Sequence, residues 1–386
     1  MRTFVHEALP GRVVFGAGAV ARVADEVAAL GLERVLVVAG GSSTTVGARI
    51  ADDLGDRCAG RLGKVRQHVP EPLASDARRT AVEVGADGVV AVGGGSAIGL
   101  AKAIAVDARA EAASGNGGVA VVAVPTTYSG SEMTPIFGVT GVGTDRHPPS
   151  DPGSATGADL YREHKQTGRD LRALPRVVVY DPALTVDLPA AVTASSGFNA
   201  LAHCVEALYA PGTNPVVQLL AAEGIRSLAG ALPAAVERPD DLDARGGTLY
   251  GAYLAGAALA VAGTALHHKL CHVLGGTYGL VHGDVNAVVL PHVVAYNSAA
   301  APDAVATVAA RLGTEPGQAA PALRALAERL GAPTSLAALG MPADGLDLAA
   351  ERAVAETGAT NPRPPDVTSL RALLQRAYDG APPTSS

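Results

Sequence analysis

Hydrophobic and polar positions follow two alternating patterns in the first half of the chain. Short apolar, β-branched runs predict buried strands at residues 12–15, 34–39, 88–92 and 119–124. Between them, Ala-rich segments with helical spacing predict helices at residues 19–30, 45–54, 75–84 and 96–106. Strands that alternate with helices form parallel sheets covered on both faces. We therefore predict an α/β domain with a mostly parallel sheet over residues 1–180.

The pattern changes after residue 180, where long Ala- and Leu-rich segments are separated by Pro, Gly and Asp. These segments predict helices at residues 194–209, 216–229, 244–262, 265–274, 304–312 and 319–330. We therefore predict an all-α domain over residues 181–386. Residues 141–170 are rich in Gly, Pro, Asp, Ser and Thr without an apolar period, so we expect an exposed excursion from the sheet there.

Composition and charge narrow the classes of function. The chain of 386 residues is 48% hydrophobic and 17% charged, which is typical of a well-buried globular fold. Its formal net charge of -7 argues against a nucleic-acid-binding surface. Three cysteines are too few and odd in number for a disulfide framework, which favours a reducing cytoplasm. The N-terminus does not resemble an export signal, and residues 253–266 are too short to span a membrane.

Two loops that follow predicted strands carry the features of a nucleotide site. The run Gly93-Gly94-Gly95-Ser96 follows a strand and opens a helix, where backbone N–H groups can receive a pyrophosphate. The next strand ends in a hydroxyl-rich loop over residues 125–132. We predict that the cofactor contacts are Gly40, Gly94, Gly95, Ser96, Thr126, Thr127 and Ser129. No acid follows the strand at 34–39, so NADPH as well as NADH should be accepted.

The second half carries histidines at helical spacing. Asn199 and His203 are four residues apart, as are His268 and His272, so each pair shares one helix face, and His282 follows in a Gly-punctuated turn. Three imidazoles can hold a divalent metal or polarise a substrate directly. The fourth metal ligand would come from position 199, where the neutral Asn is a much poorer ligand than a carboxylate. We therefore expect no tightly bound metal.

At these residues the chain resembles the iron-containing alcohol dehydrogenase superfamily and, within it, the maleylacetate reductase branch. The motifs that carry the resemblance are residues 15–18, 93–96, 125–135, 167–170, 180–182, 267–272 and 290–292. The resemblance implies a Rossmann-like nucleotide-binding domain, a helical domain, a cleft between them and a homodimer, in the architecture shared with dehydroquinate synthase. It also implies that metal-dependent members carry Asp at the position of Asn199, with histidines at the positions of His203, His268 and His282.

The reaction implied by this resemblance is the NADH- or NADPH-dependent reduction of maleylacetate, an anionic unsaturated oxo-dicarboxylate, to 3-oxoadipate without a metal. Negative charge would develop on the ketone oxygen as an enolate. We expect His203 and His268 to polarise the ketone, and His272 or His282 to deliver a proton, while Asn199 stands in place of the metal ligand. His267, Lys269 or Lys165 would neutralise the substrate carboxylates.

Two other functions remain open at this point. A metal-dependent alcohol dehydrogenase would reduce an aldehyde or ketone, with water or Asn199 completing the metal shell. A lyase similar to dehydroquinate synthase would recycle its nicotinamide, but it calls for Glu at position 199 and extra basic residues for a substrate phosphate. Neither feature is present in the sequence. An idle homologue is disfavoured, because every histidine of the family pattern is present.

Overall fold

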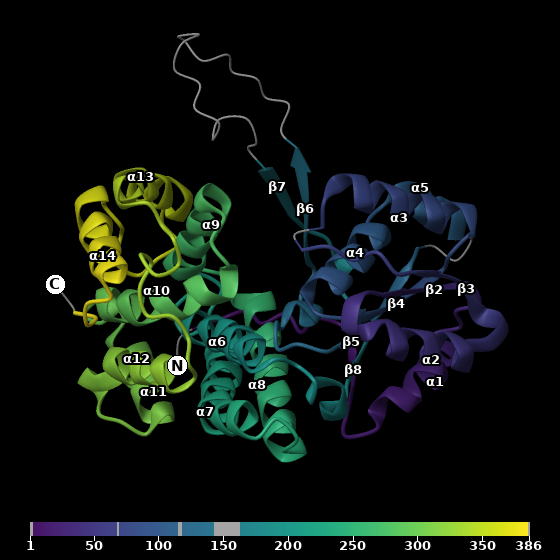
Figure 1. Cartoon of the computed structure of the whole chain (residues 1–386), viewed down its shortest axis with the longest axis horizontal. Coiled ribbons are helices and arrows are strands. Elements are labelled where there is room, and N and C mark those ends of the chain that lie inside the picture. The colour runs from purple at the N-terminus through teal and green to yellow at the C-terminus, as the bar shows by residue number, and fades with distance from the viewer. Residues whose placement is uncertain (1–2, 68, 115–117, 143–162, 385–386) are drawn as a thin grey trace, which may run out of the picture. The chain divides into compact units, whose positions relative to one another are not determined.

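A computed structural model describes residues 3–67, 69–114, 118–142 and 163–384. Within it the chain divides into two compact units, which Figure 1 shows with their helices and strands labelled. We call residues 10–126 and 134–180 the sheet unit. Residues 1–9, 127–133 and 181–386 form the helical unit. Each unit is described by itself.

The sheet unit is built on a parallel sheet. Among the described residues it has six strands in the order β1-β8-β5-β4-β2-β3. The strands are β1 (Arg12–Phe15), β2 (Val35–Ala39), β3 (Cys58–Leu62), β4 (Gly88–Gly93), β5 (Ala120–Pro125) and β8 (Val177–Tyr180). Every residue of β2, β4 and β8 is buried, and successive side chains of a strand point to opposite faces, so both faces of the sheet are covered. The predicted α/β fold is confirmed.

Helices connect these strands. They are α1 (Val23–Ala29), α2 (Thr44–Leu54), α3 (Glu71–Glu83), α4 (Gly95–Ala105) and α5 (Ala108–Ser114). The predicted helix at 19–30 is a 3-10 turn over Ala19–Arg22 followed by α1. Helix α3 starts before the predicted position because Pro72 is accepted in its first turn. Lys102 of α4 is fully buried, and its Nζ donates to the carbonyl oxygens of Thr134 and Ile136 at 2.7 and 2.9 Å.

The segment 141–170 differs from the predicted exposed excursion where the structure describes it. β6 (Ile136–Val142) and β7 (Glu163–Arg169) form an antiparallel pair, with Ile136 opposite Arg169. Hydrogen bonds between the two paired strands hold this segment in β conformation, and such pairing does not require an apolar pattern in either strand. Residues 143–162 lie outside the described part of the chain.

The helical unit is built from helices α6 to α14. They are α6 (Ala190–Ala207), α7 (Pro215–Glu237), α8 (Leu242–Ala262), α9 (Leu266–Tyr278), α10 (His282–Asn297), α11 (Pro302–Leu312), α12 (Ala319–Arg329), α13 (Leu346–Thr357) and α14 (Val367–Asp379). The predictions missed α10, α13 and α14. Helix α10 carries Pro291 and is buried at every position from Val285 to Asn297, so it lacks the one-sided apolar stripe that signals a surface helix.

Small residues allow α6, α7 and α8 to pack closely, and these helices lie side by side in Figure 1. A Cβ on Gly197 of α6 would lie 2.5 Å from a methyl of Leu232 on α7. A Cβ on Gly224 of α7 would lie 2.5 Å from the Sγ of Cys204 on α6. Cys204 is therefore a packing residue, as expected for a buried thiol.

Helix α7 is also long and apolar enough to span a membrane by length and composition, and the bent pair α8 and α9 passes the same test together. Half of the most apolar window of α7 is buried inside the protein. Core helices pass this test too, so the finding is weak evidence for a membrane span.

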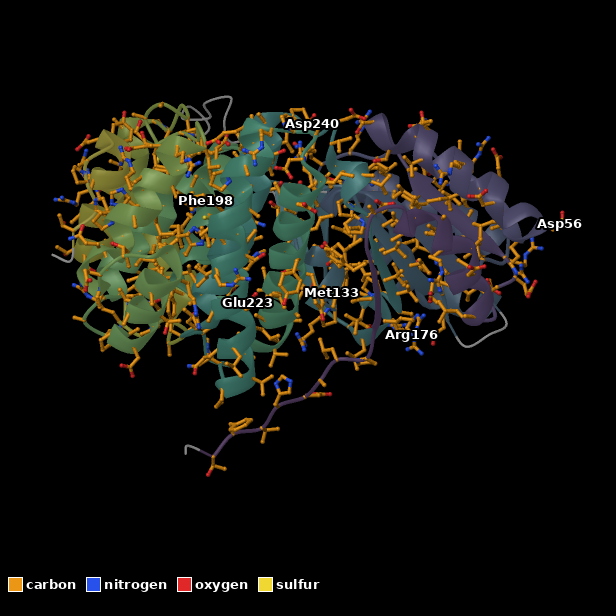
Figure 2. The ribbon with its side chains drawn as sticks, turned by 90° about the horizontal axis from the view of Figure 1, so that it is seen from below. Asp56, Met133, Arg176, Phe198, Glu223 and Asp240 are labelled. Carbon is orange, nitrogen blue, oxygen red and sulfur yellow. The ribbon has the colours of Figure 1, made fainter. Side chains whose placement is uncertain are left out.

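The hydroxyl-rich loop joins the helical unit at residues 127–133, whereas the predicted boundary placed all of 1–180 in the sheet domain. The loop lies against α8: a Cβ on Gly256 would stand 2.1 Å from the carbonyl oxygen of Gly130 and 2.9 Å from the Cβ of Met133, which Figure 2 labels. The buried Arg245 of α8 donates to the hydroxyl of Tyr128 at 3.1 Å and to Thr193 of α6 at 2.9 Å. Contacts with α6 and α8 therefore assign residues 127–133 to the helical unit, although these residues lie within the first half of the sequence.

This close approach predicts the effect of adding a methyl group to α8. We expect Gly256→Ala to destabilise the protein by about 1–3 kcal/mol, because backbone cannot yield as a flexible side chain can. The matched control is Gly230→Ala in α7, where a Cβ would meet nothing within 4 Å. That change should stabilise its helix by about 0.5–1 kcal/mol. Chemical denaturation measures both, and equal stability of the two variants would contradict the packing.

Candidate active site

The carboxyl edge of the sheet carries the predicted nucleotide-binding turn. β4 ends at Gly93, whose φ of 144° favours glycine, and α4 begins at Gly95. A Cβ on Gly93 would also lie 3.0 Å from the Cβ of Ala97. Gly94, Gly95 and Ser96 are partly exposed at the start of α4, where backbone N–H groups lack intrahelical partners. This turn fits the pyrophosphate of a dinucleotide.

The second predicted loop begins at the same edge of the sheet. The backbone N–H of Thr126, after β5, donates to the carbonyl oxygen of Gly93 at 3.1 Å. Thr126 therefore belongs to the same edge of the sheet unit. Thr127 and Ser129 lie in the helical unit and are partly exposed, and the Ser129 hydroxyl bonds to Glu132 at 3.2 Å. Packing alone is enough to require glycine at position 40, because an added Cβ would lie 2.9 Å from the Cβ of Val65.

The helical unit brings the predicted histidines together. The rings of His203 and His268 stack with centroids 4.4 Å apart and planes at 14°. His282 lies 6.4 Å from His268 and 5.8 Å from His272, centroid to centroid. His203 and His268 are buried, His282 is half-buried and His272 is exposed. We call these four residues the histidine cluster.

Three helices position the histidine cluster. Helix α6 carries Asn199 and His203 one turn apart, with the buried Phe198 beside them (Figure 2). Helix α9 carries His268 and His272. His282 was predicted in a turn but is the first residue of α10. The next residue must be small, because a Cβ on Gly283 would lie 2.8 Å from the Cβ of Ser195 on α6.

Glu206 is the residue of the site that sequence reasoning missed. It lies three residues after His203 on α6 and is 1% exposed. Its Oε2 lies 2.6 Å from Nδ1 of His268, and its Oε1 accepts from the backbone N–H of His267 at 2.7 Å. The available signal was a carboxylate three residues after a candidate histidine, in a helix with no other Asp, Glu, Lys or Arg, because i and i+3 share a face.

Burial keeps these imidazoles neutral. It lowers the pKa of His203 and of His268 well below the ordinary value, and the neighbouring histidines add to both shifts. Burial also lowers the pKa of His267 to about 3. For Glu206, burial raises the pKa of the carboxyl group, while the amides of Ala265, His267 and His268 oppose this shift. Burial holds the pKa of the Cys271 thiol well above its usual range, so it is inert.

The predicted role of His267 is wrong. Its side chain was expected to neutralise substrate carboxylates, yet it is fully buried and its Nε2 donates to the carbonyl oxygen of Asn286 at 3.3 Å. An uncharged, internally bonded ring cannot balance an anion. Lys269 is half-buried on α9, and its role stays a prediction. Lys165 lies in β7 opposite Thr140, and its side chain lies outside the described residues.

The candidate metal ligands of the site include no carboxylate at position 199. Glu206, His267 and His268 place ligand atoms within 4.8 Å of one another, but the carboxylate is already bonded to His268. In the described part of the chain, Oδ1 of Asn199, Nδ1 of His203 and Nε2 of His268 are buried without a hydrogen-bond partner. These three atoms are neutral donors, and an amide oxygen is a poor ligand for iron or zinc.

Comparison with known proteins supplies the family. A model of iron-containing alcohol dehydrogenases matches residues 10–151, and a model of the C-terminal part of that family matches residues 193–378. The chain belongs to the iron-containing alcohol dehydrogenase family. It is therefore an oxidoreductase with a nicotinamide cofactor, and the predicted resemblance is confirmed.

Individual relatives place the chain within this family. It is 46% identical to a maleylacetate reductase of Burkholderia cepacia, with 100% of each chain covered. The solved maleylacetate reductase of Agrobacterium tumefaciens is 42% identical with a TM-score of 0.87, over 99% of this chain and 100% of that one. A putative alcohol dehydrogenase of Ralstonia eutropha is 46% identical with a TM-score of 0.88, over 99% and 100%. The chain thus belongs to the maleylacetate reductase branch.

The buried neutral histidines predict a loss of stability in acid. Since the pKa of His267 falls from 6.5 to about 3 on folding, the unfolded chain binds more protons between these values. Stability is therefore full above pH 6.5 and falls as the pH drops toward 3. From pH 7 to pH 5, His267 should cost about 2 kcal/mol.

Urea denaturation of the protein and of His267→Gln at both pH values isolates this contribution. The unsubstituted protein should lose about 2 kcal/mol more than the variant over this range. Equal losses would show that His267 is charged or accessible in the folded protein.

Proposed function

We propose that this protein reduces maleylacetate, or a closely related unsaturated oxo-dicarboxylate, to 3-oxoadipate with NADH or NADPH and without a metal. The observation that carries the proposal is the histidine cluster, in which two stacked, buried imidazoles stand where metal-dependent members are expected to hold their ion. Full-length similarity to several maleylacetate reductases supports the substrate.

The cofactor is held by the chain's own groups at the edge of the sheet unit. The first turn of α4, with Gly94, Gly95 and Ser96, binds the pyrophosphate, and Thr126 lies beside it. When bound, the nicotinamide supplies a hydride. No acidic residue follows β2, where η2 (Gly41–Ser43) leads into α2, so a 2'-phosphate is tolerated.

Charge then develops on the ketone oxygen of the substrate. His203 and His268 present buried nitrogen atoms without partners in the described residues, and they meet this oxygen in a water-poor environment. His272 is exposed and His282 half-buried, so either ring can exchange protons with solvent and serve as the proton donor. Asn199 contributes an amide in place of a charged ligand. Lys269 and Lys165 balance the substrate carboxylates.

The setting of the enzyme is also a proposal. Cys58, Cys204 and Cys271 are free thiols, which suits a reducing cytoplasm. A homodimer is the state that the family resemblance implies.

The reaction is tested by following nicotinamide oxidation with maleylacetate in the presence and absence of EDTA, together with elemental analysis of protein purified without chelator. We expect turnover that survives EDTA and far less than one metal ion per chain. Net cofactor consumption excludes a lyase that recycles its nicotinamide. Asn199→Asp supplies the matched comparison, because the added carboxylate should raise the zinc or iron content.

Stoichiometric iron or zinc in the unsubstituted protein, with activity lost in EDTA, would instead establish a metal-dependent alcohol dehydrogenase. Saturated aldehydes and ketones in the same assay show whether the conjugated alkene is required.

His268 carries the largest predicted effect within the histidine cluster. We expect His268→Ala to lower kcat by about 100-fold, as the loss of one donor to a developing oxyanion typically does. His6→Ala, which changes a histidine outside the histidine cluster, is the control and should leave kcat unchanged. Unchanged turnover in His268→Ala would remove this ring from the mechanism.

A further inference from the structure

Glu206 lies where two features of the helical unit meet. It projects from α6 onto the first turn of α9, and its Oε1 accepts from the His267 backbone N–H at 2.7 Å. A carboxylate at a helix N-terminus is stabilised by the helix dipole and by the unpaired amides there. The same side chain reaches Nδ1 of His268 at 2.6 Å with its second oxygen. One carboxylate therefore caps α9 and holds the ring that α9 presents.

The hydrogen bonds of His267, the neighbouring ring, determine which of its nitrogen atoms carries the hydrogen. Nε2 of His267 lies 3.3 Å from the carbonyl oxygen of Asn286, which can only accept, so Nε2 carries the hydrogen. Sγ of Cys271 lies 3.6 Å from this Nε2 and 3.7 Å from Oδ1 of Asn286; the thiol hydrogen goes to Oδ1, which can only accept, and the sulfur can then accept from Nε2. A fully buried imidazole that carries its hydrogen on Nε2 presents Nδ1 as an acceptor.

Nδ1 of His268 therefore faces two acceptors. Oε2 of Glu206 lies 2.6 Å away, and Nδ1 of His267 lies 3.4 Å away. A hydrogen on Nδ1 of His268 satisfies both, whereas a lone pair there would face the lone pair of His267. In a neutral His268 the other nitrogen, Nε2, is then a lone pair, and it is buried without a partner in the part of the chain that the structure describes.

We propose that Glu206 is a positioning residue that keeps the hydrogen of His268 on Nδ1 and so presents Nε2 as the nitrogen that meets the ketone oxygen of the substrate. This proposal rests on the proposed function, in which His268 meets the ketone oxygen. At rest Nε2 carries a lone pair. It takes up a proton from solvent, which the exposed His272 can relay, and then donates a hydrogen bond to the ketone oxygen as negative charge develops there, while Nδ1–H stays with Glu206. The carboxylate also stabilises the protonated ring, as in other carboxylate–histidine pairs.

The tautomer is measured directly by NMR of protein labelled with ¹⁵N in its histidine rings, without substrate. The His268 signals are assigned by their loss in His268→Gln. We expect a neutral His268 with the hydrogen on Nδ1. A hydrogen on Nε2 in the unsubstituted protein would overturn the proposal whether or not maleylacetate is the substrate.

Variants of Glu206 test the link to catalysis. In Glu206→Gln the amide can donate to Nδ1, so the hydrogen of His268 should move to Nε2, and kcat should fall by about 10–100-fold. The KM for maleylacetate should change much less than kcat. Glu206→Asp keeps an acceptor, so it should retain the Nδ1–H tautomer and recover part of kcat. Glu223→Gln, on the exposed surface of α7, is the control.

A purely structural role of Glu206 predicts a different result. The melting temperature would then fall in both Glu206 variants while the tautomer and the kcat of the folded fraction stayed the same, and this would overturn the proposal. If Glu206→Gln does not fold, the tautomer of the unsubstituted protein and the kcat of Glu206→Asp still decide. An enzyme with the expected tautomer that does not turn over maleylacetate would contradict the proposed function alone.

Discussion

The hydrogen bonds of one buried carboxylate hold the chemistry of the helical unit in place. Glu206 joins α6 to the start of α9, and through His268 it connects the two helices that supply most of the histidine cluster. A charged group in this position carries a large desolvation cost, which only complete hydrogen bonding offsets. The arrangement is therefore rigid, because a shift of α9 would leave the carboxylate without its partners.

The second constraint on the site is the burial of its imidazole rings. His203, His267 and His268 are withdrawn from water, and burial lowers the pKa of each ring, so these three rings are neutral at rest. Asn199 offers a divalent ion a neutral amide where metal-dependent members are expected to carry a carboxylate. A substrate oxygen that becomes negative only during the reaction needs donors rather than anions. Histidines that are neutral at rest and take up a proton during the reaction suit this second demand.

Much of the fold was predictable from local patterns. The Val-rich strands β2, β4, β5 and β8 are buried on both faces, which produces continuous apolar runs that identify a parallel sheet. Helix α10 escaped prediction because it is buried on all sides and contains Pro291. The pair β6 and β7 also escaped, because its order comes from ladder hydrogen bonds between the two segments rather than from an apolar period in either one.

The site divides in the same way. Local sequence patterns identified the candidate site residues. Helical spacing placed Asn199 and His203 on one face, and the glycines that follow β4 marked a turn in which Gly93 has a positive φ. The packing of the helices then sets which of these side chains lie together and which bond to buried groups of the protein itself. His267 and His268 are neighbours in the chain, yet one bonds to Asn286 and the other to Glu206. Spacing along a helix sets the direction in which a side chain points, whereas its burial and its hydrogen-bond partners depend on the helices packed against that helix.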